Sequence, residues 1–240
     1  MTKEAKETVK KVFIGAVFIL AIFAFGQIYI QQEEGYLKQT QFEGVRIIRE
    51  STQLHNLFVR LMPGIVYCYS GSSKTTGFFV SEDGWVITAG HKVDRDFPKA
   101  NEIYVIFNRH EQMEALKSTD VIIANKLDLL AFKVKFKPRF YFKDFRNPHL
   151  FEECWIFGFR GVADLVPSGP GYITYNTHKP TLFYLTARVY FGNSGSPVIN
   201  RKGEVLGVAV EGYKNWDTNI IPGRVVKAFI ESIGKNKGKT

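Results

Sequence analysis

The sequence lacks the residue spacings that mark several common kinds of functional site. It has only two cysteines, Cys68 and Cys154, which lie far apart and form neither a C-x-x-C pair nor a zinc-ligand spacing. It also has no Gly-Lys-Ser/Thr phosphate-binding loop, no internal repeat and no low-complexity segment. We therefore expect no metal and no cofactor, and we leave the two cysteines as either one disulfide or two buried thiols.

Acidic residues are the scarcer kind of charge, because 23 Asp and Glu stand against 32 Lys and Arg and the net charge is +9. A basic balance suits nucleic acid or an anionic membrane surface as a partner. The chain has no long run of Lys or Arg, however, so we do not expect it to bind nucleic acid. Its hydrophobic content of 45% argues against disorder, and its 240 residues suffice for one large domain or two small ones.

One long apolar run lies near the N-terminus. Residues 12–30 contain Gln27 as their single strongly polar residue and nearly suffice to span a bilayer as a helix. Four lysines precede the run, whereas one lysine occurs in the fifteen residues after it. Because positive charge is retained on the cytoplasmic side, this asymmetry predicts that residues 1–11 are cytoplasmic and that residues 31–240 lie outside.

Two interpretations of this run remain open. We favour an uncleaved signal anchor in a single-pass membrane protein, because apolar residues continue beyond the small-x-small site Ala24-Phe25-Gly26. Cleavage at that site would remove residues 1–26 and give a secreted protein. A buried soluble helix fits less well, since no polar face appears at helical spacing. Residues 31–50 are polar and mixed in charge, which predicts a linker ahead of a folded domain at 51–240.

The folded domain is predicted to be all-β except at its two ends. Ser51 is a candidate cap for a helix that stops at Pro63-Gly64, and a last helix is expected over 224–233. Between them, short β-rich runs alternate with turn signals such as Gly169-Pro170-Gly171. The predicted strands are 65–69, 76–80, 85–88, 102–107, 121–124, 129–134, 154–158, 171–174, 182–187, 196–199 and 205–211. Short strands at this spacing predict closed antiparallel barrels or a sandwich, and we expect two such units.

The stretch Phe191-Gly192-Asn193-Ser194-Gly195-Ser196-Pro197 is the strongest candidate for a reactive site. A serine close to two glycines suits a nucleophile on a sharp turn, because glycine permits the backbone conformations that such a turn needs. The turn can also aim N–H groups at a developing oxyanion. The same composition occurs in ordinary turns, so the interpretation requires a general base and a group that orients it elsewhere in the chain.

Among the five histidines, His91 is the best candidate base. It follows the predicted strand 85–88 in the turn Ala89-Gly90-His91, where a strand end fixes the imidazole and leaves it accessible. The other four lie on the exposed side of a predicted helix or in polar loops. Asp128 is the best candidate to orient His91, since it is an acid within an apolar run and an unpaired buried carboxylate is costly. Asp120 is the reserve candidate.

The order His91, Asp128, Ser194 and the sequences around these residues resemble the trypsin-like serine peptidases of the chymotrypsin fold, and most closely their HtrA/Deg branch. The resemblance extends over residues 51–233. It is carried, in chain order, by Thr76-Gly77-Phe78-Phe79-Val80, Gly84-Trp85-Val86-Ile87-Thr88-Ala89-Gly90-His91, Asp128-Leu129-Leu130-Ala131, Gly192-Asn193-Ser194-Gly195-Ser196-Pro197, Gly203-Glu204-Val205-Leu206-Gly207-Val208 and Ile220-Ile221-Pro222. Ser196 departs from the family pattern, in which a second glycine is usual.

The resemblance implies two antiparallel Greek-key β-barrels and a peptidase that hydrolyses polypeptides through an acyl-enzyme. His91 is then the general base, Asp128 its orienting group and Ser194 the nucleophile. Backbone N–H groups of Gly192 and Ser194 hold the oxyanion. Activation through a freed N-terminal amine is not expected, because Asn193 stands where that mechanism needs an aspartate. No PDZ-like domain is expected after the final helix.

The resemblance also suggests a hypothesis about substrate choice. The base of the pocket for the residue before the cut is often set six positions ahead of the nucleophile, which gives Arg188 and would favour an acidic side chain. Glu211, on the strand expected to form a wall of that pocket, could neutralise Arg188 internally, and an arginine that points to solvent is the plainer interpretation. The HtrA/Deg branch itself suggests cleavage after small apolar residues.

The alternative to an enzyme is a catalytically inactive binding module on the same fold at the membrane. A fold alone does not fix function, so this alternative stays open. It leaves unexplained, however, why all three positions of the expected triad are filled.

Overall fold

The computed structural model describes residues 51–70, 73–91, 104–106, 116–160, 164–175, 182–212 and 218–236. No helix within these ranges is both long and apolar enough to cross a membrane. The predicted span at 12–30 and the predicted linker at 31–50 lie outside the described residues, so both stay predictions.

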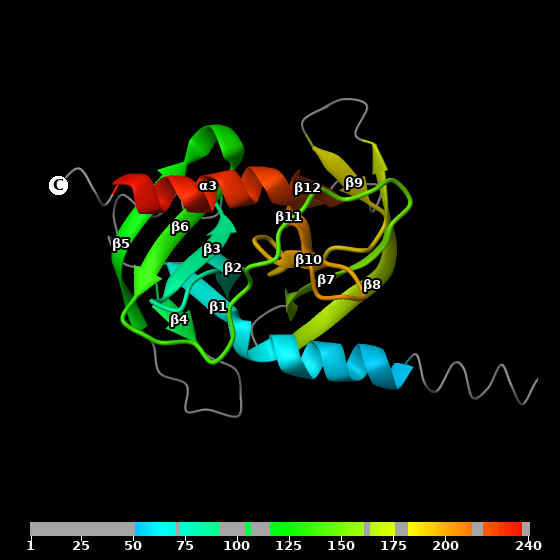
Figure 1. The fold of residues 1–240 in the computed structure, drawn as a ribbon, viewed down its shortest axis with the longest axis horizontal. Coiled ribbons are helices and arrows are strands. Elements are labelled where there is room, and N and C mark those ends of the chain that lie inside the picture. Colours follow the sequence, from blue (N-terminus) through cyan, green and yellow to red (C-terminus); the bar gives the residue numbers. More distant parts are fainter. Residues whose placement is uncertain are drawn as a thin grey trace, which may run out of the picture. The chain divides into compact units, whose positions relative to one another are not determined.

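The domain consists of two closed antiparallel β-barrels that share one strand order. The first barrel has the order β1-β2-β3-β6-β5-β4, and the second, taken from β7, has the equivalent order β7-β8-β9-β12-β11-β10. The first barrel is built from β1 (Ile65–Ser70), β2 (Ser73–Phe79), β3 (Trp85–Ala89), β4 (Tyr104–Ile106), β5 (Leu116–Ala124) and β6 (Leu129–Val134). The second is built from β7 (Glu153–Arg160), β8 (Asp164–Tyr175), β9 (Phe183–Leu185), β10 (Pro197–Ile199), β11 (Val205–Gly212) and β12 (Thr218–Pro222). Figure 1 shows the first barrel in cyan and green and the second in yellow-green to orange. The prediction of two barrels is confirmed.

Helical structure at the start of the described domain is also as predicted. Residues 51–61 are helical, and the short 3₁₀ turn η1 (Met62–Gly64) separates them from β1. Leu57 and Leu61 are buried in the core, so an apolar face at helical spacing holds this helix on the barrels.

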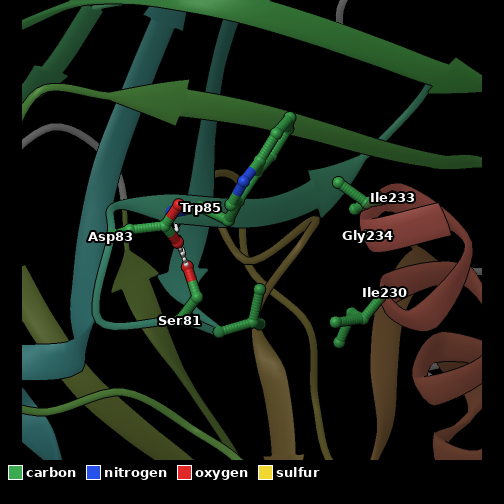
Figure 2. Close-up of a pocket in the computed structure, with 7 residues that line it drawn as sticks. Ser81, Asp83, Trp85, Ile230, Ile233 and Gly234 are labelled. Atoms are coloured by element: carbon green, nitrogen blue, oxygen red, sulfur yellow. Dashed lines mark hydrogen bonds between the residues drawn. The ribbon is translucent and has the colours of Figure 1, made fainter. Parts of the chain in front are cut away.

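The last helix, α3 (Gly223–Asn236), begins directly after β12 and confirms the helix expected over 224–233. In Figure 1 it runs from β12 toward the first barrel. Its core-facing side chains follow helical spacing: Val226, Phe229 and Ile233. A cavity of about 250 Å³ remains between the end of α3 and the turn before β3, where Figure 2 shows Trp85 across from Ile230 and Ile233.

Two strand predictions need correction in the second barrel. The turn signal Gly169-Pro170-Gly171 lies inside the long strand β8, because a bulge sets two residues of β8 against one residue of β7. Such a bulge accommodates a proline that has no N–H to donate. Strand β12 was not predicted, since two of its five residues, Thr218 and Asn219, are polar. Both are fully buried, and Thr218 Oγ1 donates a hydrogen bond to Ala187 O at 3.0 Å.

The strands of the domain appear in the sequence as apolar runs because many of them are buried on both faces. Along β1, Ile65 and Tyr67 lie in one hydrophobic cluster, whereas Val66 and Cys68 lie in another. This alternation is the two-residue period of a strand. The first cluster contains residues of both barrels and α3, while the second is confined to the first barrel and a third to the second barrel. Each barrel therefore has its own interior, and the shared cluster joins the barrels and the helices.

The two cysteines are free thiols, which settles the alternatives left open by the sequence. Cys68 and Cys154 are both buried and lie in the separate interior clusters of the two barrels. Burial raises the pKa of both thiols far above the usual range. They are therefore unreactive packing residues.

The connection between the barrels, residues 135–152, is pinned to the second barrel. Arg146 N donates a hydrogen bond to Val205 O at 3.1 Å, and Val205 N donates one to Asp144 O at 2.8 Å. The connection thus runs alongside the first residues of β11.

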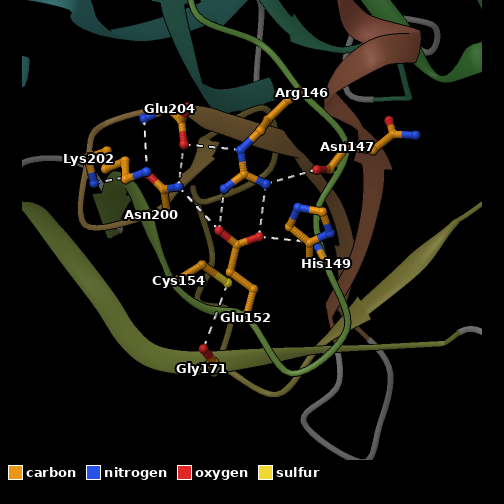
Figure 3. Close-up of polar contacts among 9 residues, drawn as sticks. All are labelled: Arg146, Asn147, His149, Glu152, Cys154, Gly171, Asn200, Lys202 and Glu204. Carbon is orange, nitrogen blue, oxygen red and sulfur yellow. Dashed lines mark hydrogen bonds and ion pairs between the residues drawn. The ribbon is translucent and has the colours of Figure 1, made fainter.

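Arg146 is also the centre of a charged cluster that ties this connection to the turn between β10 and β11 (Figure 3). Arg146 Nε donates to Glu204 Oε2 at 3.0 Å, and its terminal nitrogens donate to both oxygens of Glu152. Asn200 Nδ2 donates to Glu152 Oε1 at 3.2 Å and to Glu204 Oε2 at 2.7 Å. The hairpin that follows the predicted nucleophile is therefore anchored at its far end.

The cluster controls the protonation of Glu152. Burial alone would raise the pKa of this carboxyl, but hydrogen bonds from Arg146, the His149 N–H and Asn200 outweigh burial and lower the pKa from 4.5 to about 2. A group whose pKa is depressed by folding stabilises the folded state above its unfolded pKa. The contribution of Glu152 is therefore present above pH 4.5 and is lost as the pH falls toward 2.

We predict that Glu152→Gln flattens the acid side of the stability profile. The free energy of unfolding of the wild type should fall by up to about 3 kcal/mol between these pH values through this group. The variant should lack that part of the slope and be less stable at pH 7, because Arg146 loses a charged partner. Denaturant unfolding at several pH values measures both effects, with Glu231→Gln on the exposed face of α3 as the control. Equal slopes in wild type and Glu152→Gln would contradict the prediction.

Candidate active site

The predicted nucleophile lies on two consecutive β-turns, residues 190–196, which we call the serine turn. A hydrogen bond of 3.0 Å from Asn193 N to Tyr190 O closes the first turn. A second of 3.0 Å, from Ser196 N to Asn193 O, closes the other. The third residue of each turn has a positive φ, +100° at Gly192 and +83° at Gly195. A type II turn requires this conformation, which glycine adopts without strain. The two glycines thus shape the turns that carry the serine between them.

The serine turn packs against the first barrel at β2 and β3. A Cβ atom on Gly195 would lie 2.2 Å from Thr76 O and 2.3 Å from Thr88 Oγ1, so no side chain fits there. Thr88 lies on β3 just ahead of His91. This close approach therefore brings the serine turn and the histidine segment to the same place.

Two threonines of β2 hold the serine turn from the first barrel. Thr76 N donates to Ser194 O at 3.0 Å, and Thr76 Oγ1 donates to Gly192 O at 2.7 Å. Thr75 Oγ1 donates to Ser194 O as well. Thr76 Oγ1 also accepts a hydrogen bond from Phe159 N at 2.9 Å, so one side chain joins β2, β7 and the serine turn. The sequence did not single out either threonine. The sequence held no clear signal for them, because the first four residues of β2, Ser73-Lys74-Thr75-Thr76, are all polar.

Asn193 is fully buried, and both ends of its neutral side chain bind backbone groups. Its Oδ1 accepts a hydrogen bond from Tyr190 N at 2.8 Å, and its Nδ2 donates one to Phe159 O at 3.2 Å. A carboxylate in this place would lose the donor and face the Phe159 carbonyl oxygen unpaired. The serine turn is therefore held by an uncharged side chain.

Ser196, which departs from the family pattern, is matched by a glycine on β7. The Ser196 side chain is fully buried, and a Cβ atom on Gly158 would lie 1.8 Å from its Oγ. The hydroxyl therefore fills the room that the glycine leaves.

Two N–H groups of the serine turn are unengaged. Within the described part of the chain, the N–H groups of Gly192 and Ser194 donate to no backbone or side-chain acceptor, whereas those of Asn193 and Gly195 donate to Tyr190 O and Ala209 O. Gly192 is buried, so its N–H has no ready access to bulk water. These are the two donors predicted to hold an oxyanion.

The structure brings His91 and Asp128 into direct contact. His91 Nδ1 lies 2.8 Å from Asp128 Oδ2 and 3.0 Å from Oδ1, and the His91 backbone N–H donates to Oδ1 at 2.6 Å. Each side chain keeps 34% of its area exposed, so the imidazole is fixed and still accessible. Asp128 follows the 3₁₀ turn η2 (Asn125–Leu127) with a φ of +55°, a conformation that aspartate tolerates. The reserve candidate Asp120 lies exposed on β5.

Ser194 is directed toward the second barrel. Its side chain is half-buried, and its Oγ donates a hydrogen bond to Val210 O on β11 at 3.2 Å. No hydrogen bond joins Ser194 to His91 among the described residues. The structure therefore contains an assembled His–Asp pair and, on the adjoining turn, a serine whose hydroxyl has a different partner.

Of the two predicted substrate-pocket residues, Arg188 is described with its side chain and Glu211 only with its backbone. Arg188 is exposed, with its guanidinium carbon 5.2 Å from the centre of the Tyr190 ring, and it lines a cavity of about 470 Å³. The backbone of Glu211 pairs with Asn219 on β12, but its side chain lies outside the described part. An interaction between Arg188 and Glu211 therefore stays a prediction.

The site combines groups that acyl transfer uses. A fixed imidazole, a serine hydroxyl and two unengaged N–H groups can supply a base, a nucleophile and an oxyanion site. Within the described ranges, no group of three His, Cys, Asp or Glu side chains is placed to hold a metal ion.

Comparison with known sequences identifies a family and a curated relative. Residues 75–208 match the family described as the trypsin-like peptidase domain. A curated relative, the "probable periplasmic serine endoprotease DegP-like" of Rhizobium meliloti (strain 1021), is 27% identical over 178 residues, which cover 68% of this chain and 34% of that protein. The chain thus spans about a third of the length of the relative it matches.

Solved structures of similar fold include two proteases. The Rv3671c protease from M. tuberculosis in its active form is 20% identical, with a TM-score of 0.60 over 72% of this chain and 81% of that one. The MamO protease domain from Magnetospirillum magneticum is 18% identical, with a TM-score of 0.59 over 70% and 96%. At these identities they show the fold alone. The family match extends from β2 into β11, covers more than half of the chain and includes His91, Asp128 and Ser194, so the chain belongs to the family of trypsin-like peptidase domains.

Proposed function

We propose that the protein is a membrane-anchored serine endopeptidase of the HtrA type, in which His91, Asp128 and Ser194 carry out peptide-bond hydrolysis. The observation that carries this proposal is the His91–Asp128 pair, in which both carboxylate oxygens lie within 3.0 Å of Nδ1. This contact orients the ring and leaves Nε2 for a substrate-side proton. The serine turn lies against the end of β3, the strand that leads to the histidine.

The proposed reaction uses one proton shuttle and one covalent intermediate. Ser194 Oγ leaves its hydrogen bond with Val210 O, turns toward His91 Nε2 and attacks the carbonyl carbon of the substrate as the imidazole takes its proton. The imidazolium, stabilised by Asp128, returns the proton to the leaving amine as the C–N bond breaks. Water then repeats the sequence on the acyl-enzyme and regenerates the serine.

Oxyanion stabilisation falls to the unengaged N–H groups of Gly192 and Ser194. In each tetrahedral intermediate these donors hold the negative oxygen, and they need no competing bond to be broken first. Removal of one such donor typically costs about a hundredfold to a thousandfold in kcat.

One observation favours a second candidate, the catalytically inactive binding module. The Ser194 hydroxyl is bonded to Val210 O, and no bond to His91 replaces it in the described structure. Catalytic hydrogen bonds are often long or misaligned before substrate binds, which is why we place the enzyme first. A serine-directed fluorophosphonate probe separates the two candidates, because a binding module does not react with it.

We predict that Ser194→Ala abolishes probe labelling and lowers casein cleavage on the order of a millionfold, to background, because the nucleophile is removed. The thermal unfolding midpoint should stay close to that of the wild type, since a half-buried hydroxyl with one hydrogen bond is lost. Ser232→Ala, which removes a serine hydroxyl from α3, is the matched control and should label normally. Wild-type rates in Ser194→Ala would reject the triad, and an unlabelled wild type would favour the binding module.

The location we propose is an extracytoplasmic peptidase domain tethered through residues 12–30. The lysine asymmetry around this apolar run supports the orientation, and the name of the Rhizobium meliloti relative places that protein in the periplasm. Secretion after cleavage near Gly26 is the alternative.

Protease protection tests this topology. Protease added to intact cells or spheroplasts should remove a C-terminal tag and leave an N-terminal tag intact, with a cytoplasmic marker protein as the control for lysis. A protected C-terminal tag would reverse the proposed orientation. A mature chain that begins near Gln27 would establish the cleaved form in place of the anchor.

Polypeptides are the proposed substrates, and Arg188 is the proposed selector of an acidic residue before the cut. Its guanidinium offers paired hydrogen bonds to a carboxylate. A peptide library should then show cleavage after Glu or Asp, reduced at least about tenfold in Arg188→Ala but not in Arg224→Ala, which alters an exposed arginine of α3. Cleavage confined to small apolar residues would reject this role for Arg188.

A further inference from the structure

The Thr76 hydroxyl is hydrogen-bonded on both sides where β2 meets β7 and the serine turn. It accepts a hydrogen bond from Phe159 N of β7 at 2.9 Å and donates its own hydrogen to Gly192 O at 2.7 Å. Only a group that accepts and donates at the same time can make both bonds, and a hydroxyl does so. Thr76 is fully buried, so water cannot readily replace either bond.

Phe159 is also bound to the serine turn through its carbonyl group. Its C=O accepts a hydrogen bond from Asn193 Nδ2 at 3.2 Å, while its N–H is bound to Thr76 Oγ1. The backbone of Phe159, the Thr76 hydroxyl and the Gly192–Asn193 peptide therefore form a closed ring of hydrogen bonds. In such a network each bond restrains the others, so loss of the Thr76 hydroxyl would also loosen the Asn193 side chain.

The Gly192–Asn193 peptide plane is held at both of its polar ends. Its carbonyl oxygen receives the Thr76 hydroxyl, and its N–H donates to Tyr190 O at 3.0 Å. This plane connects the two proposed oxyanion donors, Gly192 N–H and Ser194 N–H, along the chain. The dihedral angles on either side of a planar peptide set how its neighbours are oriented, and Gly192, with a φ of +100°, lacks the Cβ that would restrict those angles. The Thr76 bond is thus a restraint placed next to the most flexible residue of the turn.

Gly158 on β7 leaves the space that this hydroxyl occupies. A Cβ atom at Gly158 would lie 2.8 Å from Thr76 Oγ1 and 1.8 Å from Ser196 Oγ. Both hydroxyls belong to fully buried residues. The packing of β2 against β7 therefore gives the Thr76 hydroxyl little freedom to move away from Gly192 O.

We propose that Thr76 is a positioning residue of the peptidase, whose hydroxyl sets the relative orientation of the two oxyanion donors. Both hydrogen bonds of this hydroxyl end on backbone groups of the protein, so it acts through the serine turn and not by contact with the reacting atoms. The effect on catalysis rests on the proposed peptidase function, whereas the restraint on the turn does not.

Thr75, the neighbouring residue on β2, provides a comparison. Its hydroxyl donates to Ser194 O, but Thr76 N donates to the same oxygen at 3.0 Å. Loss of the Thr75 hydroxyl therefore leaves this carbonyl with a partner. Loss of the Thr76 hydroxyl leaves Gly192 O with none among the described residues. We expect the effect of Thr75→Val to be clearly smaller than that of Thr76→Val.

Thr76→Val tests the role on the full chain, because valine keeps the branched shape of threonine and removes the hydroxyl. For a peptide that the wild type cleaves, kcat should fall on the order of a hundredfold while KM changes by less than about twofold, since misplaced donors weaken binding of the transition state. The rate of fluorophosphonate labelling should fall in parallel. Thr76→Ser, which keeps the hydroxyl, should restore most of both rates.

The control for lost stability is Val226→Ala, which removes core volume from α3 far along the chain from the serine turn. Its thermal unfolding midpoint should fall, as that of Thr76→Val does, but its kcat should stay close to the wild-type value. Thr76→Cys, whose thiol is a weaker donor, should give an intermediate kcat and serves as the test if the valine variant does not fold.

Hydrogen exchange gives a measurement that does not depend on activity. Deuterium uptake over residues 190–196, followed by mass spectrometry, should be faster in Thr76→Val than in the wild type and should return to the wild-type rate in Thr76→Ser.

The proposal would be overturned by a wild-type kcat in Thr76→Val or, where that variant does not fold, in Thr76→Cys. A loss in Thr76→Val expressed only as a raised KM, or a loss of kcat equal to that of Val226→Ala, would overturn it as well. A wild type that neither labels nor cleaves would overturn the peptidase function and the catalytic half of the proposal. Faster exchange in Thr76→Val would in that case still establish the restraint on the turn.

Discussion

The hydrogen bonds from Thr76 to the serine turn are the interaction on which the candidate active site depends. A turn with two glycines has little conformational preference of its own, so it costs more entropy to fix than a turn without them. Thr76 holds the carbonyl groups of Ser194 and Gly192 on the first barrel and receives Phe159 N from the second. Fixing these carbonyls fixes the peptide planes of the turn. The nucleophile and the oxyanion donors are thereby placed by one residue of β2, through its backbone N–H and its hydroxyl, where the barrels meet.

Charge is distributed around this junction according to burial. At the junction itself, the fully buried Asn193 holds the serine turn through neutral hydrogen bonds to Tyr190 N and Phe159 O. An aspartate at this position would bury a negative charge, and neither of these backbone groups is a cation that could pair with it. Farther out, where water still reaches the side chains, Arg146 binds Glu152 and Glu204 and anchors the hairpin that follows the turn. The desolvation cost of a charged cluster is lower at that depth, because its side chains remain partly hydrated.

The sequence predicted the elements whose signal is local. Strands with two buried faces appear as apolar runs, and the closing helix appears as a helical face. The candidate site residues lie in turns, and two of them, His91 and Ser194, stand next to a glycine. What it could not show are long-range relations. The bulge that places Pro170 inside β8 depends on a register with β7, and β12 is polar in sequence because Thr218 binds Ala187 O. Thr75 and Thr76 belong to the candidate site only because the serine turn of the other barrel lies against them.

The free-energy terms that hold the serine turn in the described conformation are small. Gly192 is buried with an unengaged N–H, which costs about 1–3 kcal/mol, and the Ser194 hydroxyl is held by Val210 O through a single hydrogen bond worth about 1 kcal/mol. A ligand that binds one state alone shifts such an equilibrium by about 2.7 kcal/mol at a hundred times its dissociation constant. This shift is comparable in size to the free energies given above for the unengaged Gly192 N–H and the Ser194 hydrogen bond. Tyr190 and Asn193 share two hydrogen bonds, which close the first of the two β-turns. A substrate carbonyl oxygen bound by the unengaged N–H groups of Gly192 and Ser194 would therefore suffice to favour a serine turn in which the Ser194 hydroxyl faces His91.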